Sequence, residues 1–279
     1  TEGGNIHSDW FAWEQKPGNI HDGSSSILAA DSWNKYDQDV KILKESNQNA
    51  YRFSIEWARI EPKKGKFDPE ALEHYRKELQ MLKKNNITTM VTLFHFTLPQ
   101  WVAEEGGFTN EKTIDYFLNF VEKVTREYHQ HVNFWATLNE PTVYALKSYL
   151  QGEWPPCQKS KINFFKTWMI LADTHNRTYD LIKKICPNSK VGIVLNMANY
   201  IPKENSYLNK GLCHIVKFAS NEIFTRQILK HTNFLGINYY MQFIIKPSKP
   251  MLQTDPARKS DFGWPLHPEG IYQVIKDNT

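Results

Sequence analysis

Strand-like and helix-like segments alternate along this chain of 279 residues, and this alternation restricts its possible folds more than any other feature. Apolar periodicity predicts five strands, near residues 50–55, 88–94, 132–138, 190–195 and 233–239. Helices are predicted near residues 32–46, 69–82, 111–128, 163–184 and 210–229, with a short helix after Pro268. Strict alternation is typical of a parallel sheet with right-handed helical crossovers.

Both a doubly wound sheet and a barrel satisfy that pattern. No Gly-rich phosphate loop follows any predicted strand, which argues against a nucleotide-binding doubly wound sheet. The polar, aromatic and carboxylate residues gather at the carboxyl ends of the strands, where a parallel barrel has its active site. We therefore predict one α/β domain over residues 1–279, of the (β/α)8 TIM-barrel type. It is incomplete, because the chain supplies about five βα units and closure needs eight strands.

Composition excludes several function classes. The net charge of +4 is modest and no basic stripe with interleaved aromatics occurs, so no nucleic-acid partner is expected. No apolar stretch is long enough to span a membrane. The three cysteines lack metal-ligand spacing, and so sparse a set fits a reducing compartment, which predicts a cytoplasmic protein. The 14% aromatic content suits a carbohydrate site, but a large aromatic core accounts for it equally well.

Candidate functional residues occupy the ends of the predicted strands, which converge on one pocket in a barrel. They are Arg52, His95, Asn139, Glu140, Asn238 and Tyr240. Glu140 has a carboxyl that can donate a proton to a leaving-group oxygen and later accept one from water. Arg52 or Tyr240 can keep a neighbouring carboxylate ionised. Each also has a plain alternative, such as a solvated loop glutamate, a structural histidine or a buried ion-pair arginine.

Ordered motifs go beyond these single residues. They are Tyr51–Pro62 (YRFSIEWARIEP), Thr92–Pro99, Thr137-Leu138-Asn139-Glu140-Pro141, Phe234–Tyr240, and Trp264 with Pro268-Glu269-Gly270. In this order and spacing the chain resembles glycoside hydrolase family 1, the β-glucosidase and β-galactosidase family. Thr137–Pro141 resembles that family's acid/base motif, and Phe234–Tyr240 its sixth-strand motif.

The resemblance implies a retaining β-glycosidase that hydrolyses terminal β-linked sugars from a small β-glycoside or oligosaccharide, with Glu140 as general acid/base. It implies that His95, Asn139, Asn238 and Tyr240 adjoin the sugar or the nucleophile and that Arg52 is a partner of the nucleophile. It implies no cofactor and no metal. The segment 144–154 would border the leaving group, and Phe96 stands where the family often has Trp.

The chain departs from the family at both ends. Its five predicted strands correspond to the family's second to sixth, and the family's nucleophile Glu follows the seventh strand. Glu56 and Glu61 do not match that position. The nucleophile is therefore expected outside this chain, either in the rest of a longer or split enzyme or in a homodimer partner or companion chain that completes the barrel. The alternative is a catalytically inactive truncated barrel that acts as a sugar-binding or self-assembling module. The sequence does not specify the sugar or the aglycone.

Overall fold

The computed structural model describes residues 2–254 and 259–278. The five predicted strands all form and make one sheet in the order β1-β2-β3-β4-β6. They are β1 (Ala50–Ser54), β2 (Thr88–Phe94), β3 (Phe134–Asn139), β4 (Lys190–Asn196) and β6 (Phe234–Asn238). Chain order is kept across the sheet, and helices connect the strands. These features confirm the incomplete (β/α)8 architecture.

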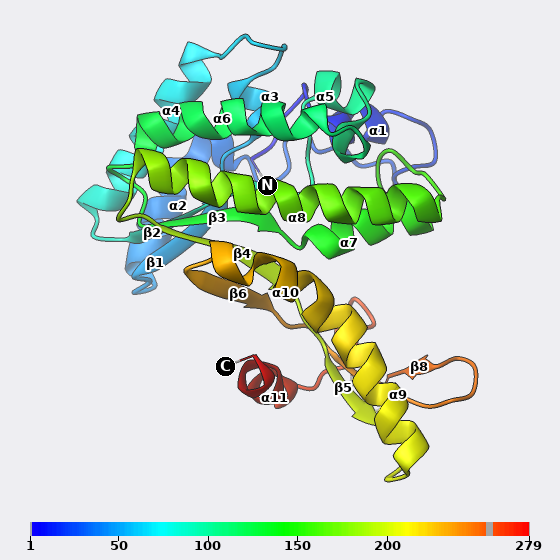
Figure 1. Cartoon of the computed structure of the whole chain (residues 1–279). Coiled ribbons are helices and arrows are strands. Elements are labelled where there is room, and N and C mark those ends of the chain that lie inside the picture. The colour runs from blue at the N-terminus through cyan, green and yellow to red at the C-terminus, as the bar shows by residue number, and fades with distance from the viewer. Residues whose placement is uncertain (1, 255–258, 279) are drawn as a thin grey trace. The chain divides into compact units, whose positions relative to one another are not determined.

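The chain divides into two compact units. The first comprises Thr1–Ile193 with His231–Leu235, and the second comprises Val194–Lys230 with Gly236–Thr279. In the first unit β1 pairs in parallel with β2, and β2 with β3. Helices α4 (Pro69–Lys84), α6 (Lys112–Tyr128) and α8 (Lys161–Ile185) lie along one face of these strands, and α2 (Ser32–Glu45) packs beside α4 (Figure 1).

Helix α4 begins where the sequence signals predict. The Asp68 carboxylate accepts hydrogen bonds from the backbone N–H groups of Glu70 and Ala71, at 2.8 and 3.2 Å. Pro69 takes the first helical position, where its missing N–H is not needed. The first turn is therefore satisfied locally, and the apolar face of the helix is left to pack on the sheet.

Much of the aromatic content is core. Trp57, in the short helix α3 (Trp57–Ile60), is 2% exposed, stacks on Phe120 and meets the edge of Phe117 from α6. Its indole N–H donates to the Glu61 carboxylate at 2.8 Å. The core explanation of the aromatic composition is therefore correct here. Short helices α3 and α5 (Gln100–Glu104) and the 3-10 turn η1 (Gly107–Thr109) were not predicted, because four or five residues carry too little periodicity.

The second unit contains a sheet that sequence periodicity missed. Strands β5 (Asn199–Pro202), β7 (Gln242–Ile245) and β8 (Leu252–Gln253) form it, with β5 parallel to β7 and β7 antiparallel to β8. The prediction of five strands was therefore too low. Strands of two to four residues are too short for an alternating pattern to be recognised.

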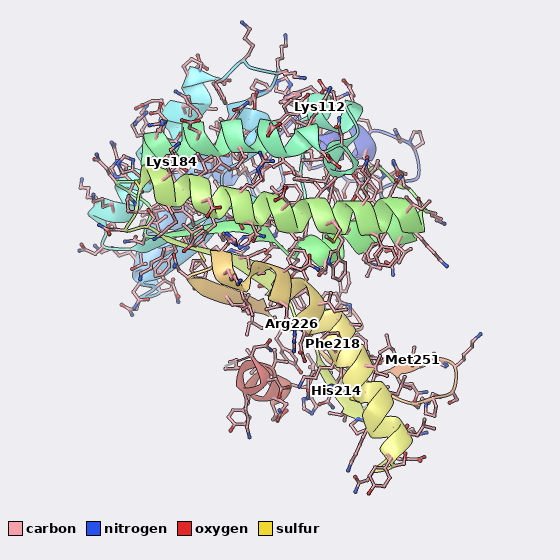
Figure 2. The ribbon with its side chains drawn as sticks, viewed as in Figure 1. Lys112, Lys184, His214, Phe218, Arg226 and Met251 are labelled. Carbon is pink, nitrogen blue, oxygen red and sulfur yellow. The ribbon has the colours of Figure 1, made fainter. Side chains whose placement is uncertain are left out.

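The helix predicted over 210–229 is interrupted. It consists of α9 (Tyr207–Lys217), the π-helical turn η3 (Phe218–Glu222), α10 (Ile223–Ile228) and the 3-10 turn η4 (Leu229–His231). Arg226 holds the π turn from the following helix, since its guanidinium lies 5.1 Å from the Phe218 ring centroid and 2.9 Å from the Glu222 carboxylate (Figure 2). The helix predicted after Pro268 is α11 (Gly270–Asp277). None of the helices among the described residues combines the length and apolar character needed to cross a bilayer.

Candidate active site

Three neighbouring strands are joined by the side chain of Arg52. Its Nε donates to the Thr92 hydroxyl at 2.9 Å, and its Nη2 donates to the Asn139 amide oxygen at 2.6 Å. These residues come from β1, β2 and β3, which are consecutive in the sheet. The guanidinium fixes the orientation of Asn139, which is 1% exposed. The predicted proximity of Arg52 and Asn139 is therefore observed.

Glu140 directly follows β3 in a left-handed backbone conformation, with φ 45° and ψ 54°. Such a conformation is uncommon for a residue other than glycine and persists where its surroundings enforce it, often at functional sites. Helix α7 (Pro141–Ala145) starts at the next residue, and the Glu140 carbonyl accepts from the N–H groups of Val143 and Tyr144. The residue is 5% exposed, so the chain turn holds a buried carboxyl group at the end of β3.

His95 follows the end of β2, and its Nδ1 lies 3.2 Å from the Ser54 hydroxyl. Desolvation by the surrounding protein, aided by the nearby Arg52 charge, lowers the pKa of His95 to about 4. The residue as a whole is nevertheless exposed to solvent. The imidazole is therefore neutral at pH 7, with hydrogen-bonding capacity that a ligand can use.

Arg52, Ser54 and His95 line a cavity of about 490 Å³ together with Phe96 and Glu56. The Glu56 carboxylate accepts from the Asn5 amide at 3.0 Å and from the Thr97 hydroxyl at 2.6 Å. Burial raises the pKa of Glu56. The cavity thus presents a cation, a neutral imidazole and a hydrogen-bonded carboxyl, a set that suits a hydroxyl-rich ligand.

An aromatic cluster adjoins this cavity. The rings of Phe96 and Trp154 are 4.8 Å apart, and Trp10 lies 5.5 Å from Trp154. Phe96 has a positive φ of 78°, and its carbonyl accepts from the Trp10 indole at 3.0 Å. Sequence reasoning did not select Trp10. The run of aromatic residues between Trp10 and Trp13 was the signal that could have identified it.

Trp154 ends a segment of unusual backbone geometry. Helix α7 runs into the π-helical turn η2 (Leu146–Gln151), and Gly152 follows with a positive φ. The Lys147 ammonium closes the turn by pairing with the Glu153 carboxylate at 2.6 Å. Single π turns inside helices occur frequently at functional sites.

Asn238 and Tyr240 belong to the second unit. Asn238 ends β6, and its carbonyl accepts from the Met197 N–H at 3.1 Å. Tyr240 is 43% exposed, and its ring lies 5.1 Å from that of Trp264. The first unit therefore brings Arg52 and Asn139 into direct contact and places His95 on the cavity wall. The roles predicted for Asn238 and Tyr240 remain predictions.

Two further carboxyl groups line the cavity near Arg52, those of Glu2 and Glu78. Burial, followed by repulsion between neighbouring carboxylates, raises the pKa of Glu78 to about 8 and that of Glu2 to about 7. Glu2 is held by the Tyr75 hydroxyl at 2.6 Å and the Arg59 guanidinium at 2.7 Å. Glu78 makes no ion pair within the described residues, which makes it the more pH-sensitive of the two.

We expect Glu78→Gln to stabilise the protein above neutral pH. A pKa raised by folding means that the folded state binds the proton more tightly, so the stability of the native protein falls as pH rises from about 4.5 to about 8. Glutamine does not ionise, so the variant does not lose this stability as the pH rises. Urea unfolding at pH 8 is expected to show a gain of a few kcal/mol, because each unit of the rise from 4.5 to about 8 is worth about 1.4 kcal/mol, with little change near pH 4.5. A gain of the same size at both pH values would contradict this.

Among the described residues, no three His, Cys, Asp or Glu side chains lie close enough together to hold a metal ion. Cys157, Cys186 and Cys213 are free thiols.

The chain matches known proteins over nearly its whole length. It is 28% identical to the 1,4-β-D-glucan glucohydrolase of Thermotoga neapolitana, over 96% of this chain and 72% of that protein. It is 38% identical to the non-cyanogenic β-glucosidase of Trifolium repens, over 96% of this chain and 66% of the relative. The structure of a β-glycosidase from Pyrococcus horikoshii superimposes with a TM-score of 0.89 at 30% identity, covering 99% of this chain and 69% of that one.

The matched region includes the strand ends described above. Residues 1–224 match the profile of glycosyl hydrolase family 1, and this range contains Arg52, His95, Asn139 and Glu140. Sequence profile, relatives and fold agree, and the chain belongs to glycosyl hydrolase family 1.

Proposed function

We propose that this chain carries the acid/base half of a retaining β-glycosidase, with Glu140 as the general acid/base. The observation that supports this best is the buried Glu140 carboxyl at the end of β3, next to an Asn139 that the Arg52 guanidinium orients. The relatives bear the names β-glucosidase and glucan glucohydrolase, so the proposed substrates are terminal β-linked glucose-type sugars on a small glycoside or oligosaccharide.

The proposed reaction has two steps. In the first, a nucleophilic carboxylate attacks the anomeric carbon while Glu140 gives its proton to the departing glycosidic oxygen. In the second, the ionised Glu140 takes a proton from water, and the water oxygen displaces the enzyme carboxylate from the anomeric carbon. The sugar is released with its configuration retained, and both carboxyl groups return to their starting states.

The other residues are proposed to position the sugar. Neutral His95 and the fixed amide of Asn139 would bind sugar hydroxyls, and Asn238 and Tyr240 would adjoin the sugar or the nucleophile. Arg52 would hold the nucleophile ionised, because an adjacent positive charge favours the carboxylate. The cluster of Phe96, Trp154 and Trp10 would face the leaving group, since aromatic faces pack against apolar groups.

The nucleophile is proposed to lie outside residues 1–279. A retaining pair needs carboxyl groups about 5–5.5 Å apart. Three carboxyl groups of the described residues line the cavity with Arg52. Glu56 is already bound to Asn5 and Thr97, and Glu2 is bound to Tyr75 and Arg59. Burial raises the pKa of Glu78 to about 8, so its carboxyl is largely protonated at neutral pH and is a poor nucleophile. The chain spans 66–72% of the length of the relatives named above, so roughly a third of each relative has no counterpart in it. A residue of that remaining part, in the same polypeptide or in a companion chain, would complete the pair.

The test is the stereochemistry of hydrolysis. We expect the assembled enzyme, residues 1–279 together with the part that supplies the nucleophile, to cleave p-nitrophenyl β-D-glucopyranoside and not its α anomer. Proton NMR in the first minutes should detect β-glucose before mutarotation. Release of α-glucose from the β-glycoside would overturn the retaining mechanism.

A second candidate function follows from the sheet edges. Strands β1 and β6 stand at the two ends of the sheet order, and edge strands present unpaired backbone groups to other chains. In a sugar-binding module that assembles as a homodimer, the edge strands of one copy would pair with those of the other. Calorimetry that detects glucose binding without turnover would favour this function over hydrolysis, and a strictly monomeric species in sedimentation would exclude the dimer.

A further inference from the structure

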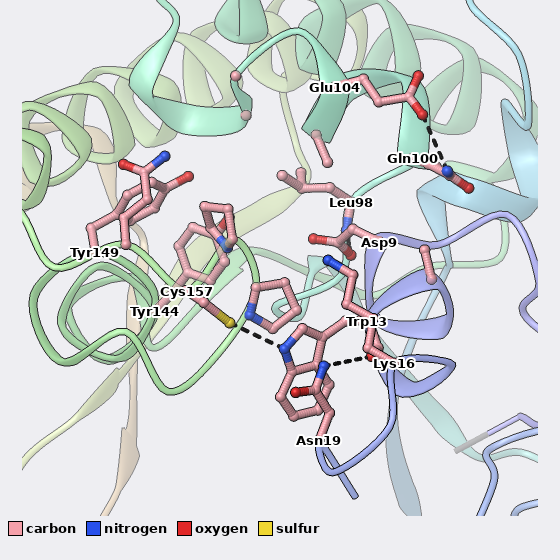
Figure 3. Close-up of a pocket in the computed structure, with 17 residues that line it drawn as sticks. Asp9, Trp13, Lys16, Asn19, Leu98, Gln100, Glu104, Tyr144, Tyr149 and Cys157 are labelled. Carbon is pink, nitrogen blue, oxygen red and sulfur yellow. Dashed lines mark hydrogen bonds between the residues drawn. The ribbon is translucent and has the colours of Figure 1, made fainter.

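A second cavity, of about 470 Å³, lies in the first unit. Its wall comes from α1 (Asp9–Glu14), the segment 98–107, α7 with η2, and residues 155–158 (Figure 3). None of Arg52, His95, Asn139 and Glu140 lines it. It is therefore distinct from the site proposed for catalysis.

The floor of this cavity holds a buried carboxyl group. Asp9 is 7% exposed, and its Oδ1 accepts from the backbone N–H groups of Trp10 and Leu98, both at 2.9 Å. Asp9 makes no ion pair within the part of the chain that the structure describes. Burial raises its pKa to about 7. A carboxylate buried this deeply normally has a charged partner. Both backbone hydrogen bonds of Asp9 go to Oδ1, so its second oxygen can accept a hydrogen bond from a ligand.

A buried phenol also faces the cavity. The Tyr144 hydroxyl, on a side chain 1% exposed, makes no hydrogen bond of satisfactory geometry among the described residues, although it interacts with the neighbouring Tyr149 hydroxyl. Tyr149, equally buried, contributes a second phenol to the floor. A buried polar group without a partner costs free energy, and a ligand or water that bonds to it recovers that cost.

The walls are flat and apolar, and the rim is polar. The Trp13 indole lines the cavity (Figure 3), and Pro155 and Pro156 add apolar surface to its lining. The Trp13 N–H donates to the Cys157 sulfur at 3.1 Å, which holds the indole in place. The rim carries amide, carboxylate and ammonium groups from Asn19, Gln100, Glu104 and Lys16.

We propose that this cavity is a non-catalytic binding site for one monosaccharide unit. A pyranose has C–H faces that pack on an indole and hydroxyl groups that donate to a carboxylate or pair with a phenol. A cavity of this volume, apolar on its walls and polar at a few points, has the size and character of a small-molecule site. The proposal does not depend on hydrolysis at Glu140.

Cys157 provides a reporter inside the site. It is the exposed cysteine of the three, while Cys186 is partly buried and Cys213 is buried. We expect D-glucose to slow the alkylation of Cys157 by iodoacetamide in a saturable way, as measured by peptide mass spectrometry on the full chain. An equal osmolality of glycine betaine, which has no hydroxyl groups, should leave the rate unchanged. Absence of saturable protection, or equal protection by betaine, would overturn the proposal.

Two isosteric variants test the contacts separately. Tyr144→Phe removes a hydroxyl that lacks a well-formed hydrogen bond, and Asp9→Asn keeps an oxygen for the two backbone N–H groups while it removes the charge. Each should raise the glucose concentration needed for half-maximal protection about three- to tenfold, which corresponds to the loss of roughly one hydrogen bond. If either variant fails to fold by circular dichroism, the other decides. Glu140→Gln should leave the protection unchanged. If Glu140→Gln lost the protection, or if the two cavity variants were protected as well as the parent, the bound glucose would lie elsewhere.

Discussion

In the assembled enzyme, which includes the part that supplies the nucleophile, replacing Glu140 by glutamine is expected to lower kcat about 10²–10⁴-fold on an aryl β-glucoside with a poor leaving group, the usual contribution of a general acid. Glutamine keeps the size and hydrogen-bonding shape of the side chain but has no proton to transfer. A good leaving group, such as the 2,4-dinitrophenolate of 2,4-dinitrophenyl β-glucoside, departs without protonation. The first step of the reaction with such substrates should therefore be nearly unaffected. The glycosyl-enzyme should then accumulate, which appears as a pre-steady-state burst of the released phenolate.

The second half of the reaction gives an independent readout. In Glu140→Ala, azide can attack the glycosyl-enzyme without a general base, so it should restore turnover and yield β-glucosyl azide. Glu122→Gln, which changes an exposed carboxyl on α6, is the matched control and should retain full activity. Equal losses on good and poor leaving groups, or the absence of an azide product, would show that Glu140 is not the acid/base.

The sequence identifies Glu140 by its place in the chain, and the structure adds its backbone state. The sequence alone shows a strand of apolar and β-branched residues that ends in Asn139-Glu140-Pro141. It does not show the left-handed φ of Glu140, because this results from β3, α7 and the residues around them acting together. The same holds for Arg52. Its type suggested a carboxylate partner, and nothing in the sequence indicated its contacts with the hydroxyl of Thr92 and the amide of Asn139, 40 and 87 residues away.

What the sequence missed has two physical causes. Strands β5, β7 and β8 are each too short to carry a periodic signal, and β5 also depends on pairing with β7, 43 residues further along the chain. The contact of Trp10 with Phe96 spans 86 residues and depends on a positive φ at a phenylalanine. Local patterns predicted the long elements within a few residues, but contacts of this range require the folded chain.

Gly192→Ala is expected to destabilise the first unit by about 1–3 kcal/mol or more, the usual cost of overpacking. A Cβ at Gly192 would lie 2.2 Å from the Phe234 carbonyl oxygen and 2.7 Å from the Phe234 ring. Both lie on the neighbouring strand β6, and backbone cannot move aside as a flexible side chain can. The added methyl group must therefore push β4 and β6 apart, which lengthens the hydrogen bonds between them. Urea unfolding followed by tryptophan fluorescence should show a lower midpoint with an unchanged m-value.

Gly211→Ala is the control for the same chemical change. Gly211 lies inside α9, and a Cβ there meets no atom within 4 Å. Alanine is about 1 kcal/mol more favourable than glycine in a helix interior, so this variant should be as stable as the parent or slightly more stable. The two substitutions therefore have opposite expected signs, although each adds one methyl group. A Gly192→Ala midpoint equal to that of the parent would mean that β4 and β6 are not held at the close approach described here. The strand pair that leads to Asn238 would then have to be placed differently.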